Sequence, residues 1–283
     1  MKRGWHMTSF TDIHCHIVPG IDDGSANLAE SLAMARMAEA DGTKSIVATP
    51  HQLGANSQVS AEAIRQGVAD LQNALNDEGI GVSILPGADV RIEPELSKLV
   101  KQGKVLTLAD QGKHVLLELP HETYFPLEPL LAALARQGLV GILSHPERNR
   151  GIIRKPEVMW DVVKAGGLLQ ITAASLTGAF GRSPQKIAEM CVEERLIHFI
   201  ASDAHDTKNR PFGMRAAYDT IIEMADEGLA ELVCCENPAK VVAGDEVAGG
   251  VTGSRRSARK TRGRSQKPDQ RAKPGGWLGW FGR

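Results

Sequence analysis

Short apolar runs alternate with amphipathic segments through most of the chain. Runs of aliphatic and β-branched residues predict buried strands at 45–49, 82–85, 115–119, 140–143, 168–172 and 197–201, and a further strand is expected at 12–16. Between the runs, a helix is expected from Asn27, with Leu28, Leu32, Ala35 and Ala38 on its apolar face. The same spacing predicts further helices at 64–75, 128–136, 156–165, 184–195 and 214–227.

Regular alternation of strands and helices predicts an α/β protein with a parallel sheet covered by helices. About seven strands favour a closed barrel, although a doubly wound open sheet also fits the pattern. No strand is followed by a glycine-rich phosphate loop, which argues against a nucleotide-binding fold.

Composition narrows the class of protein. Of the 283 residues, 42% are hydrophobic, which excludes disorder as the main state, and four cysteines are too few for a disulfide scaffold. The sequence contains no apolar stretch long enough to span a membrane, and its first residues do not resemble a secretory signal. We therefore expect a cytoplasmic protein with reduced thiols.

Charge divides the chain in two. Residues 251–283 hold ten Lys or Arg and one acidic residue, whereas residues 1–250 hold 23 basic and 33 acidic residues. We place an N-terminal extension at 1–10, a folded domain at 11–243 and a basic, disordered tail at 244–283. Three roles for the tail remain open: a solvated appendage, a contact with an anionic membrane surface helped by Trp277, Trp280 and Phe281, or nucleic-acid binding, which we expect least.

The pair His14 and His16 is the first candidate for chemistry. Alternate residues of a strand point to the same side, so both imidazoles face one way and Cys15 faces the other. Two imidazoles one pleat apart can chelate a metal ion, but the same pattern also suits two ordinary histidines.

Other ligand-type residues follow the ends of further apolar runs, and these positions favour a metal cluster. Active sites of parallel α/β proteins are built at the carboxyl ends of strands. The residues in question are Asp23, His51, Asp89, Glu118, His145, Asp203 and His205. Nitrogen and oxygen donors without cysteine suit Mn²⁺, Fe²⁺ or catalytic Zn²⁺, and such a cluster suits hydrolysis of phosphate esters. Arg148 and Arg210 lie in loops beside the ligands and could neutralise phosphoryl oxygens.

The motifs HCH at 14–16, TPH at 49–51, LLELP at 116–120, SHPERNR at 144–150, QITAASLTGAFG at 170–181 and IHFIASDAH at 197–205 resemble the PHP (polymerase and histidinol phosphatase) superfamily. Within it, the chain is most similar to the bacterial manganese-dependent protein-tyrosine phosphatases of capsule and exopolysaccharide loci. The likeness runs from about residue 11 to about 243.

This resemblance implies a distorted, TIM-like (β/α)7 barrel with three divalent ions, with manganese expected and iron or zinc as alternatives. It assigns His14, His16 and Asp203 to the first ion, His145 and Glu118 to the second, and Asp23, His51 and His205 to the third. Asp89 would bridge the first two, in a place where the family typically has Glu. Arg148 and Arg210 would be the catalytic residues that bind the phosphoryl group.

The substrate implied by the resemblance is the phosphotyrosine tail of a membrane tyrosine kinase that controls polysaccharide export. The protein would then be cytoplasmic, and it could contact the inner face of the membrane peripherally. It could also form a homo-oligomer. Two alternatives stay open: a phosphatase of a small phosphomonoester such as histidinol phosphate, and a non-catalytic metal-binding scaffold.

Overall fold

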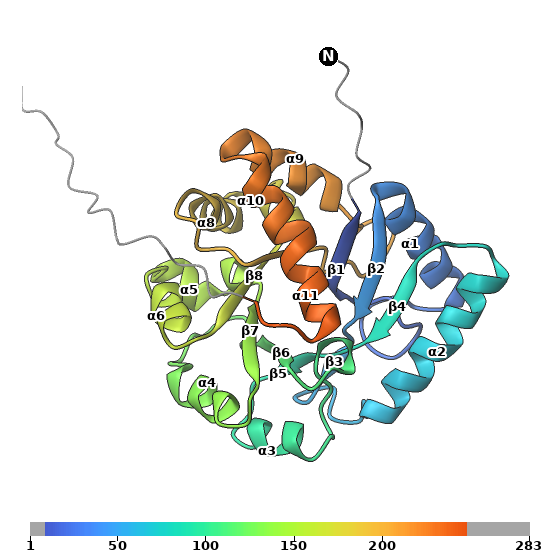
Figure 1. Cartoon of the computed structure of the whole chain (residues 1–283), viewed down its shortest axis with the longest axis horizontal. Helices are drawn as coiled ribbons and strands as arrows, with labels where there is room; N and C mark the ends of the chain where they lie inside the picture. Colours follow the sequence, from blue (N-terminus) through green and yellow to red (C-terminus); the bar gives the residue numbers. More distant parts are fainter. Residues whose placement is uncertain (1–8, 248–283) are drawn as a thin grey trace, which may run out of the picture. The chain divides into compact units, whose positions relative to one another are not determined.

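The computed structural model of the chain describes residues 9–247, and the predicted tail lies outside the described residues from residue 248 onward. Parallel strands form the centre of this part (Figure 1). They are β1 (Phe10–Cys15), β2 (Thr43–Ala48), β3 (His51–Gln52), β4 (Ser83–Pro86), β5 (Asp89–Arg91), β6 (His114–Glu118), β7 (Val140–Ser144), β8 (Leu168–Thr172) and β9 (Phe199–Ala201).

The strands form two parallel sheets with the orders β1-β2-β4 and β3-β5-β6-β7-β8-β9. Two residues separate β2 from β3, and two separate β4 from β5, so each pair is one interrupted strand that passes from the first sheet to the second. At the other edge, the Asp203 amide donates to the His14 carbonyl at 2.8 Å and the His16 amide donates to the Ala204 carbonyl at 2.9 Å. The sheets therefore close into a ring, as expected for a distorted barrel with seven strand positions.

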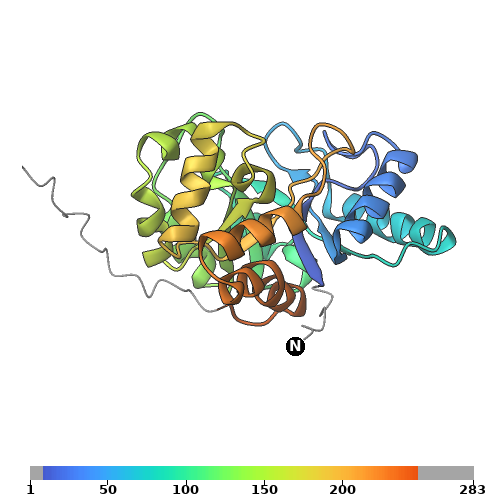
Figure 2. The ribbon, with the colours of Figure 1, turned by 90° about the horizontal axis from the view of Figure 1, so that it is seen from above.

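Helices cover the outside of the ring (Figure 2). They are α1 (Leu28–Asp41), α2 (Ala61–Asp77), α3 (Leu96–Lys101), α4 (Glu128–Ala135), α5 (Arg150–Arg154), α6 (Val158–Lys164), α7 (Ala173–Leu176), α8 (Arg182–Glu193), α9 (Met214–Met224), α10 (Glu227–Glu231) and α11 (Asn237–Ala243), with short turns η1 (Leu108–Asp110), η2 (Pro146–Arg148) and η3 (Leu232–Glu236). In α2 the predicted stripe of Ile64, Val68, Leu71 and Leu75 is buried, and Ser60 caps the helix by accepting from the Ala63 amide.

The buried face of α1 differs from the prediction. The helix begins after Asn27, whose side chain accepts from the Glu30 amide, but Leu28 is 44% exposed and Ser31 is buried. Ser31 Oγ donates to the Ile17 carbonyl at 2.7 Å, in the loop that leads out of β1. Anchoring this loop rotates the helix away from the face that apolar spacing alone predicted.

The helix predicted over 214–227 is also divided. It ends at Met224, and α10 begins after Asp226, whose side chain accepts from the Leu229 amide at 2.8 Å. Asp226 caps a new helix, and apolar periodicity alone does not reveal this break between the two helices.

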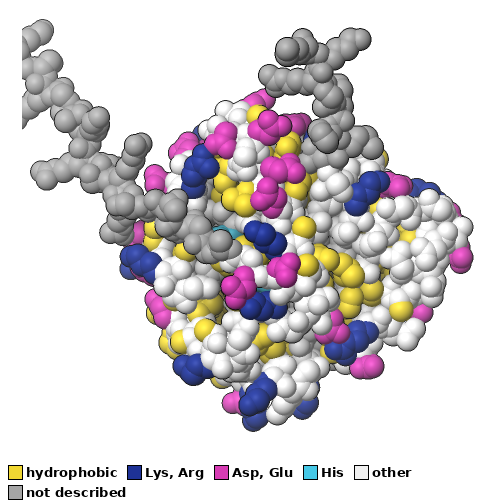
Figure 3. Space-filling view, in the orientation of Figure 1, with side chains coloured by type: hydrophobic (Ala, Val, Ile, Leu, Met, Phe, Trp, Pro, Cys, Tyr) yellow, Lys and Arg dark blue, Asp and Glu magenta, His cyan; other side chains and the backbone are white. Residues whose placement is uncertain are grey.

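The apolar core has two layers. Inside the ring, Ile13, Leu116, Ile142 and Phe199 pack with Val241 of α11, which closes the amino-terminal end of the barrel. A larger layer lies between the strands and the outer helices. On the face that carries α11, basic and acidic side chains intermingle (Figure 3). Because α11 closes the amino-terminal end, and active sites of such barrels lie at the carboxyl ends of the strands, catalytic groups are expected at that opposite end.

Candidate metal centre

The predicted ligands lie together at the carboxyl ends of the strands. His14 is the last residue but one of β1 and His16 directly follows the strand, while His51 opens β3 and Asp89 opens β5. The others follow later strands: Glu118 ends β6, His145 follows β7, and Asp203 and His205 follow β9. Asp23 is in the loop between β1 and α1. Residues from position 14 to position 205 thus meet at one barrel mouth.

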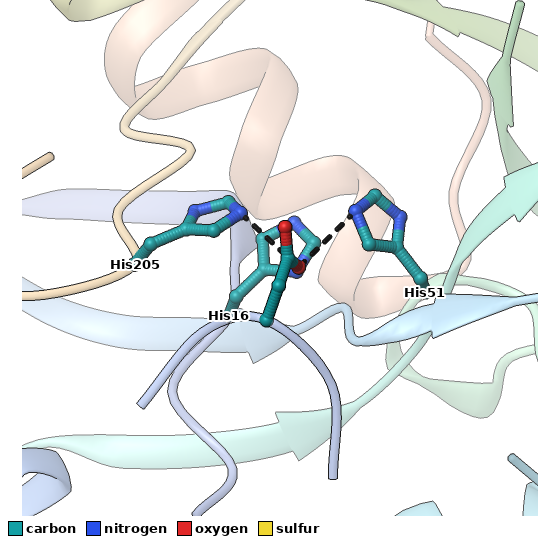
Figure 4. Close-up of side chains that lie close together, drawn as sticks. His16, His51 and His205 are labelled. Atoms are coloured by element: carbon teal, nitrogen blue, oxygen red, sulfur yellow. Dashed lines mark ion pairs between the residues drawn. The ribbon is translucent and has the colours of Figure 1, made fainter. Parts of the chain in front are cut away.

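Within the described residues, the ligand atoms form four overlapping groups whose members lie within 4.8 Å of one another. These are His16, Asp23, His51 and His205; His14, His16 and Asp89; His14, His145 and Asp203; and His51, Asp89 and Glu118. Figure 4 shows His16, His51 and His205 around one carboxylate, which belongs to Asp23. Donor atoms bound to one ion at about 2.1 Å are separated by about 3 to 3.5 Å, and the groups have this scale.

The two histidines of β1 are oriented by second residues. His14 Nδ1 donates to Gln170 Oε1 at 2.9 Å, and His16 Nδ1 donates to Asp22 Oδ2 at 2.7 Å. Burial lowers the pKa of both imidazoles, so each is neutral near pH 7. The Nε2 lone pairs then face each other at 3.2 Å, an arrangement that a shared cation stabilises and that repels without one.

Asp89 gives the sharpest test of whether a metal fits. Its side chain is fully buried, and neither carboxylate oxygen has a hydrogen-bond partner among residues 9–247. Burial, with the nearby charges of Glu118 and Asp203, raises the pKa of Asp89 well above its usual value. A buried carboxylate without donors is costly, whereas a divalent ion satisfies it directly. Because Asp89 belongs to two of the groups, it is placed to serve two ions.

The imidazoles of His145 and His205 are also in the neutral form that binds metals. Burial lowers the pKa of His145 well below its ordinary value, and the charge of Arg148 acts in the same direction. Burial lowers the pKa of His205 to about 4. Neutral imidazoles and carboxylates form a donor set suited to manganese, iron or catalytic zinc.

The backbone adopts an unusual conformation at two of the predicted ligands. His145 has φ of 32° and Asp203 has φ of 52°, in the left-handed region that residues other than glycine rarely adopt. His145 directly follows β7, and Asp203 lies two residues after the end of β9, where the chain turns each side chain into the mouth. Local strain of this kind persists where the surrounding structure over-determines it, as at functional sites.

Arg148 and Arg210 both reach this centre. Arg148 pairs with Asp203 Oδ2, and Arg210 Nη2 lies 2.5 Å from the same oxygen. Burial would raise the pKa of Asp203, but His14 and the two arginines outweigh it and hold the pKa well below its usual value. The Arg148 guanidinium also lies 4.3 Å from the centre of the Phe180 ring, which holds it at the rim.

Three residues near the site were not predicted from the sequence. Gln170 orients His14, and Arg91 donates to Glu118 Oε2 at 3.0 Å. Asp22 orients His16 and also accepts from the His51 amide at 2.9 Å. The signal for Gln170 was present, since it is the polar residue in the otherwise apolar run LLQIT.

Other residues have structural roles. Glu147 is buried and accepts from the Thr172 amide and from Ser175 Oγ, which fixes η2 against β8. The cysteines Cys15, Cys191, Cys234 and Cys235 are all free and buried, as expected of packing residues. Burial raises the pKa of the Cys15 thiol, so it is no candidate for a thiolate nucleophile.

The fold and the site define a barrel protein with a cluster of histidines and carboxylates of the kind that binds metal ions. Residues 10–243 match the model of the family described as capsular polysaccharide synthesis, CpsB/CapC, and the chain belongs to this family.

Named relatives agree with this assignment. The chain is 38% identical over 208 residues to the tyrosine-protein phosphatase YwqE of Bacillus subtilis, covering 73% of this chain and 81% of YwqE. It is 25% identical to the tyrosine-protein phosphatase CpsB of Streptococcus pneumoniae, covering 82% of this chain and 97% of CpsB.

Solved structures extend the likeness to three dimensions. A chain from the crystal structures of YwqE and CpsB, described there as metal-dependent tyrosine phosphatases, aligns with a TM-score of 0.81 at 34% identity, covering 84% of this chain and 96% of that one. A lactonase from Listeria monocytogenes aligns with a TM-score of 0.50 at 15% identity, covering 85% of this chain and 96% of that one, and shares the fold alone.

Proposed function

We propose that this chain is a metal-dependent protein-tyrosine phosphatase that hydrolyses phosphotyrosine in a polypeptide. The observation that carries the proposal is the convergence of five histidines and four carboxylates at one barrel mouth, with two arginines on Asp203 at its edge. The similarity to YwqE and CpsB supports the same reaction.

Nine residues would hold the metals: His14, His16, Asp23, His51, Asp89, Glu118, His145, Asp203 and His205. The grouping of Asp23, His51 and His205 supports one ion site. Glu118 groups with His51 and Asp89, while His145 groups with His14 and Asp203, and Asp89 lies between them. Three ions remain the proposal, with Mn²⁺ as the expected metal and Fe or Zn as alternatives.

The chemistry follows from the donor set and the arginines. Divalent ions held by these residues would polarise phosphoryl oxygens and lower the pKa of a water that could then act as nucleophile. When substrate binds, Arg148 and Arg210 would give up their ion pairs with Asp203 and contact the phosphoryl oxygens instead. There they would stabilise the negative charge that develops on these oxygens. Gln170 and Asp22 keep the first two imidazoles turned toward the substrate side.

The polypeptide substrate we propose is the tyrosine-rich tail of a membrane kinase that controls capsule or exopolysaccharide synthesis. In residues 9–247, we find no helix of the length and apolarity needed to cross a bilayer. Action at the cytoplasmic face of the membrane, a peripheral contact through residues 251–283 and a homo-oligomeric state stay predictions.

The test compares His14→Ala and Asp203→Ala with the wild type on p-nitrophenyl phosphate, a phosphotyrosyl peptide and histidinol phosphate. We expect kcat/KM for the first two substrates to fall at least a hundredfold with the far-UV circular dichroism unchanged, and histidinol phosphate to be a poor substrate throughout. Asp161→Ala is the matched control, because Asp161 is exposed on α6 and belongs to none of the metal-ligand groups.

Chelation provides the second arm of the test. Dialysis against EDTA should abolish turnover, and Mn²⁺ should restore it. Full turnover in the chelated protein, or in both variants, would overturn the proposal.

A further inference from the structure

A cavity of about 580 Å³ opens beside the metal centre. Its walls include Arg148 and Phe180, together with Arg150 and Arg154 of α5 and Arg182 at the start of α8. Figure 1 places α5 and α8 side by side, and the two helices are in contact. We call this cavity the arginine groove.

The arginine groove is strongly basic. Four arginines line it, and no Asp or Glu is among the described residues that do so. Arg150 pairs with Glu122 and Arg182 with Glu189, both at 3.2 Å, but the arginine side chains are 60% and 65% exposed. Such exposed pairs contribute little and exchange readily. Arg154 has no ion-pair partner in the part of the chain that the structure describes, so the groove keeps unneutralised positive charge.

The start of α8 adds to this charge. Its cap residue is Gly181, which offers no side-chain cap, and its first turn contains no acidic residue. The amide end of a twelve-residue helix therefore meets the groove without an anion of its own.

Arg148 connects the groove to the metal centre. It pairs with Asp203 on one side, and it stacks on Phe180, which lines the groove, on the other. A phosphotyrosine bound at the metals would thus place the neighbouring residues of its own polypeptide along this wall.

We propose that the arginine groove binds acidic side chains that flank the phosphotyrosine, which makes acidic surroundings a determinant of substrate choice. This inference rests on the proposed function, because it concerns the same substrate. The groove suits carboxylates, since guanidinium groups bind them through paired hydrogen bonds. The chain's own basic tail is no suitable occupant, because residues 251–283 carry ten Lys or Arg and would be repelled.

The experiment uses two phosphotyrosyl peptides that differ only in flanking Glu or Gln, with p-nitrophenyl phosphate as the substrate without flanks. The variant Arg150→Gln/Arg154→Gln/Arg182→Gln leaves Arg148 intact. The matched control, Arg36→Gln/Lys98→Gln/Arg136→Gln, removes the same charge from surfaces away from the groove.

For the wild type and the control we expect kcat/KM for the Glu peptide to exceed that for the Gln peptide about tenfold, and the excess to shrink with added salt. The groove variant should lose this preference and keep its turnover of p-nitrophenyl phosphate. Equal kcat/KM for the two peptides in the wild type, or an unchanged preference in the groove variant, would overturn the inference.

A binding measurement separates this inference from the proposed function. Fluorescence anisotropy with the same peptides on the EDTA-dialysed protein should show tighter binding of the Glu peptide, lost in the groove variant. If no substrate is hydrolysed but this difference persists, the proposed function fails and the groove assignment stands. If hydrolysis occurs but neither assay shows a difference, the groove assignment fails alone.

Discussion

At the scale of single residues, the centre is built around a carboxylate that the protein itself does not satisfy. Asp89 is buried without a donor, beside imidazoles whose Nε2 atoms face one another. Without a cation, these groups oppose folding, and with one they become ligands. Metal binding and stability should therefore be linked through Asp89.

Replacing Asp89 tests that link. Asp89→Asn should raise the melting temperature of the EDTA-treated protein, because it removes a buried unpaired carboxyl worth roughly 1–3 kcal/mol. It should also weaken the stabilisation by Mn²⁺ and lower kcat/KM at least a hundredfold. Asp89→Glu, which keeps the charge, is the control and should retain metal-dependent stabilisation. A lower melting temperature for Asp89→Asn without metal would contradict this account.

His198 predicts a pH dependence of stability. Burial lowers its pKa to about 4, and its Nδ1 accepts from the Leu169 amide at 3.1 Å. The unfolded chain takes up a proton below pH 6.5 while the folded one does not, so this group lowers the free energy of unfolding as pH falls from 6.5 toward 4.

We expect this contribution to cost about 2 kcal/mol at pH 5 relative to pH 7. His198→Asn keeps an acceptor for Leu169 and removes the titration. Urea unfolding at the two pH values should therefore show a smaller difference for the variant than for the wild type. Equal differences would rule out His198 as a source.

The candidate metal ligands at the strand ends were predictable, because the sequence shows both the residue types that bind metals and the places where the strands end. Partners of ligands were less so. Gln170 is 156 positions from His14, and nothing local specifies that their side chains meet. The bond from His16 to Asp22 depends on how the loop after β1 folds back, which local sequence does not specify either.

At the scale of elements, the loop between β1 and α1 carries both Asp22 and Asp23. It turns back so tightly that a Cβ on Gly24 would lie 2.2 Å from the His16 carbonyl oxygen. The Ser25 amide donates to that same carbonyl at 3.0 Å. The position of two site carboxylates thus depends on the absence of one side chain.

Gly24→Ala should push the loop away from His16 and displace Asp23 from His51 and His205. We expect kcat/KM to fall at least tenfold and Mn²⁺ affinity to fall with it, measured by turnover and by calorimetric titration. Gly213→Ala is the control, because an added Cβ there meets nothing within 4 Å. Normal metal affinity in Gly24→Ala would show that the loop adapts.

Elements that apolar periodicity defines well, such as α2, were predicted with their buried faces. The strands β3 and β5, of two and three residues, were not, because they are too short to have a period and exist only as continuations of β2 and β4 into the second sheet. The buried face of α1 was set by Ser31 and the preceding loop, a tertiary contact that outweighs helix periodicity.

At the scale of the whole folded part, Asp12 reinforces the backbone hydrogen bonds that close the ring. This buried residue accepts from the Ser202 amide at 3.0 Å and from Ser202 Oγ at 2.5 Å, joining β1 to the segment after β9. It also accepts from the His14 amide at 3.2 Å. Two buried amides and the Ser202 hydroxyl thus donate to one side chain.

Asp12→Ala should lower the free energy of unfolding by roughly 2–4 kcal/mol, because it leaves the buried amides of Ser202 and His14 without a partner. Thr11→Ala, the neighbouring position on β1, should change it by less than about 1 kcal/mol. Denaturant titration of both variants with and without Mn²⁺ measures the difference. Equal stability of the two variants would show that the ring closes without Asp12.

The joint between β1 and the segment after β9 sets the order of events during synthesis. His14 leaves the ribosome almost two hundred residues before Asp203, and the backbone bonds between them exist only when both are present. A nascent chain therefore cannot assemble this part of the centre until Asp203 has emerged. Truncated products that end before Asp203 lack the closing contact and the side chain of Asp203. The complete centre can therefore form only in chains that contain nearly the whole domain.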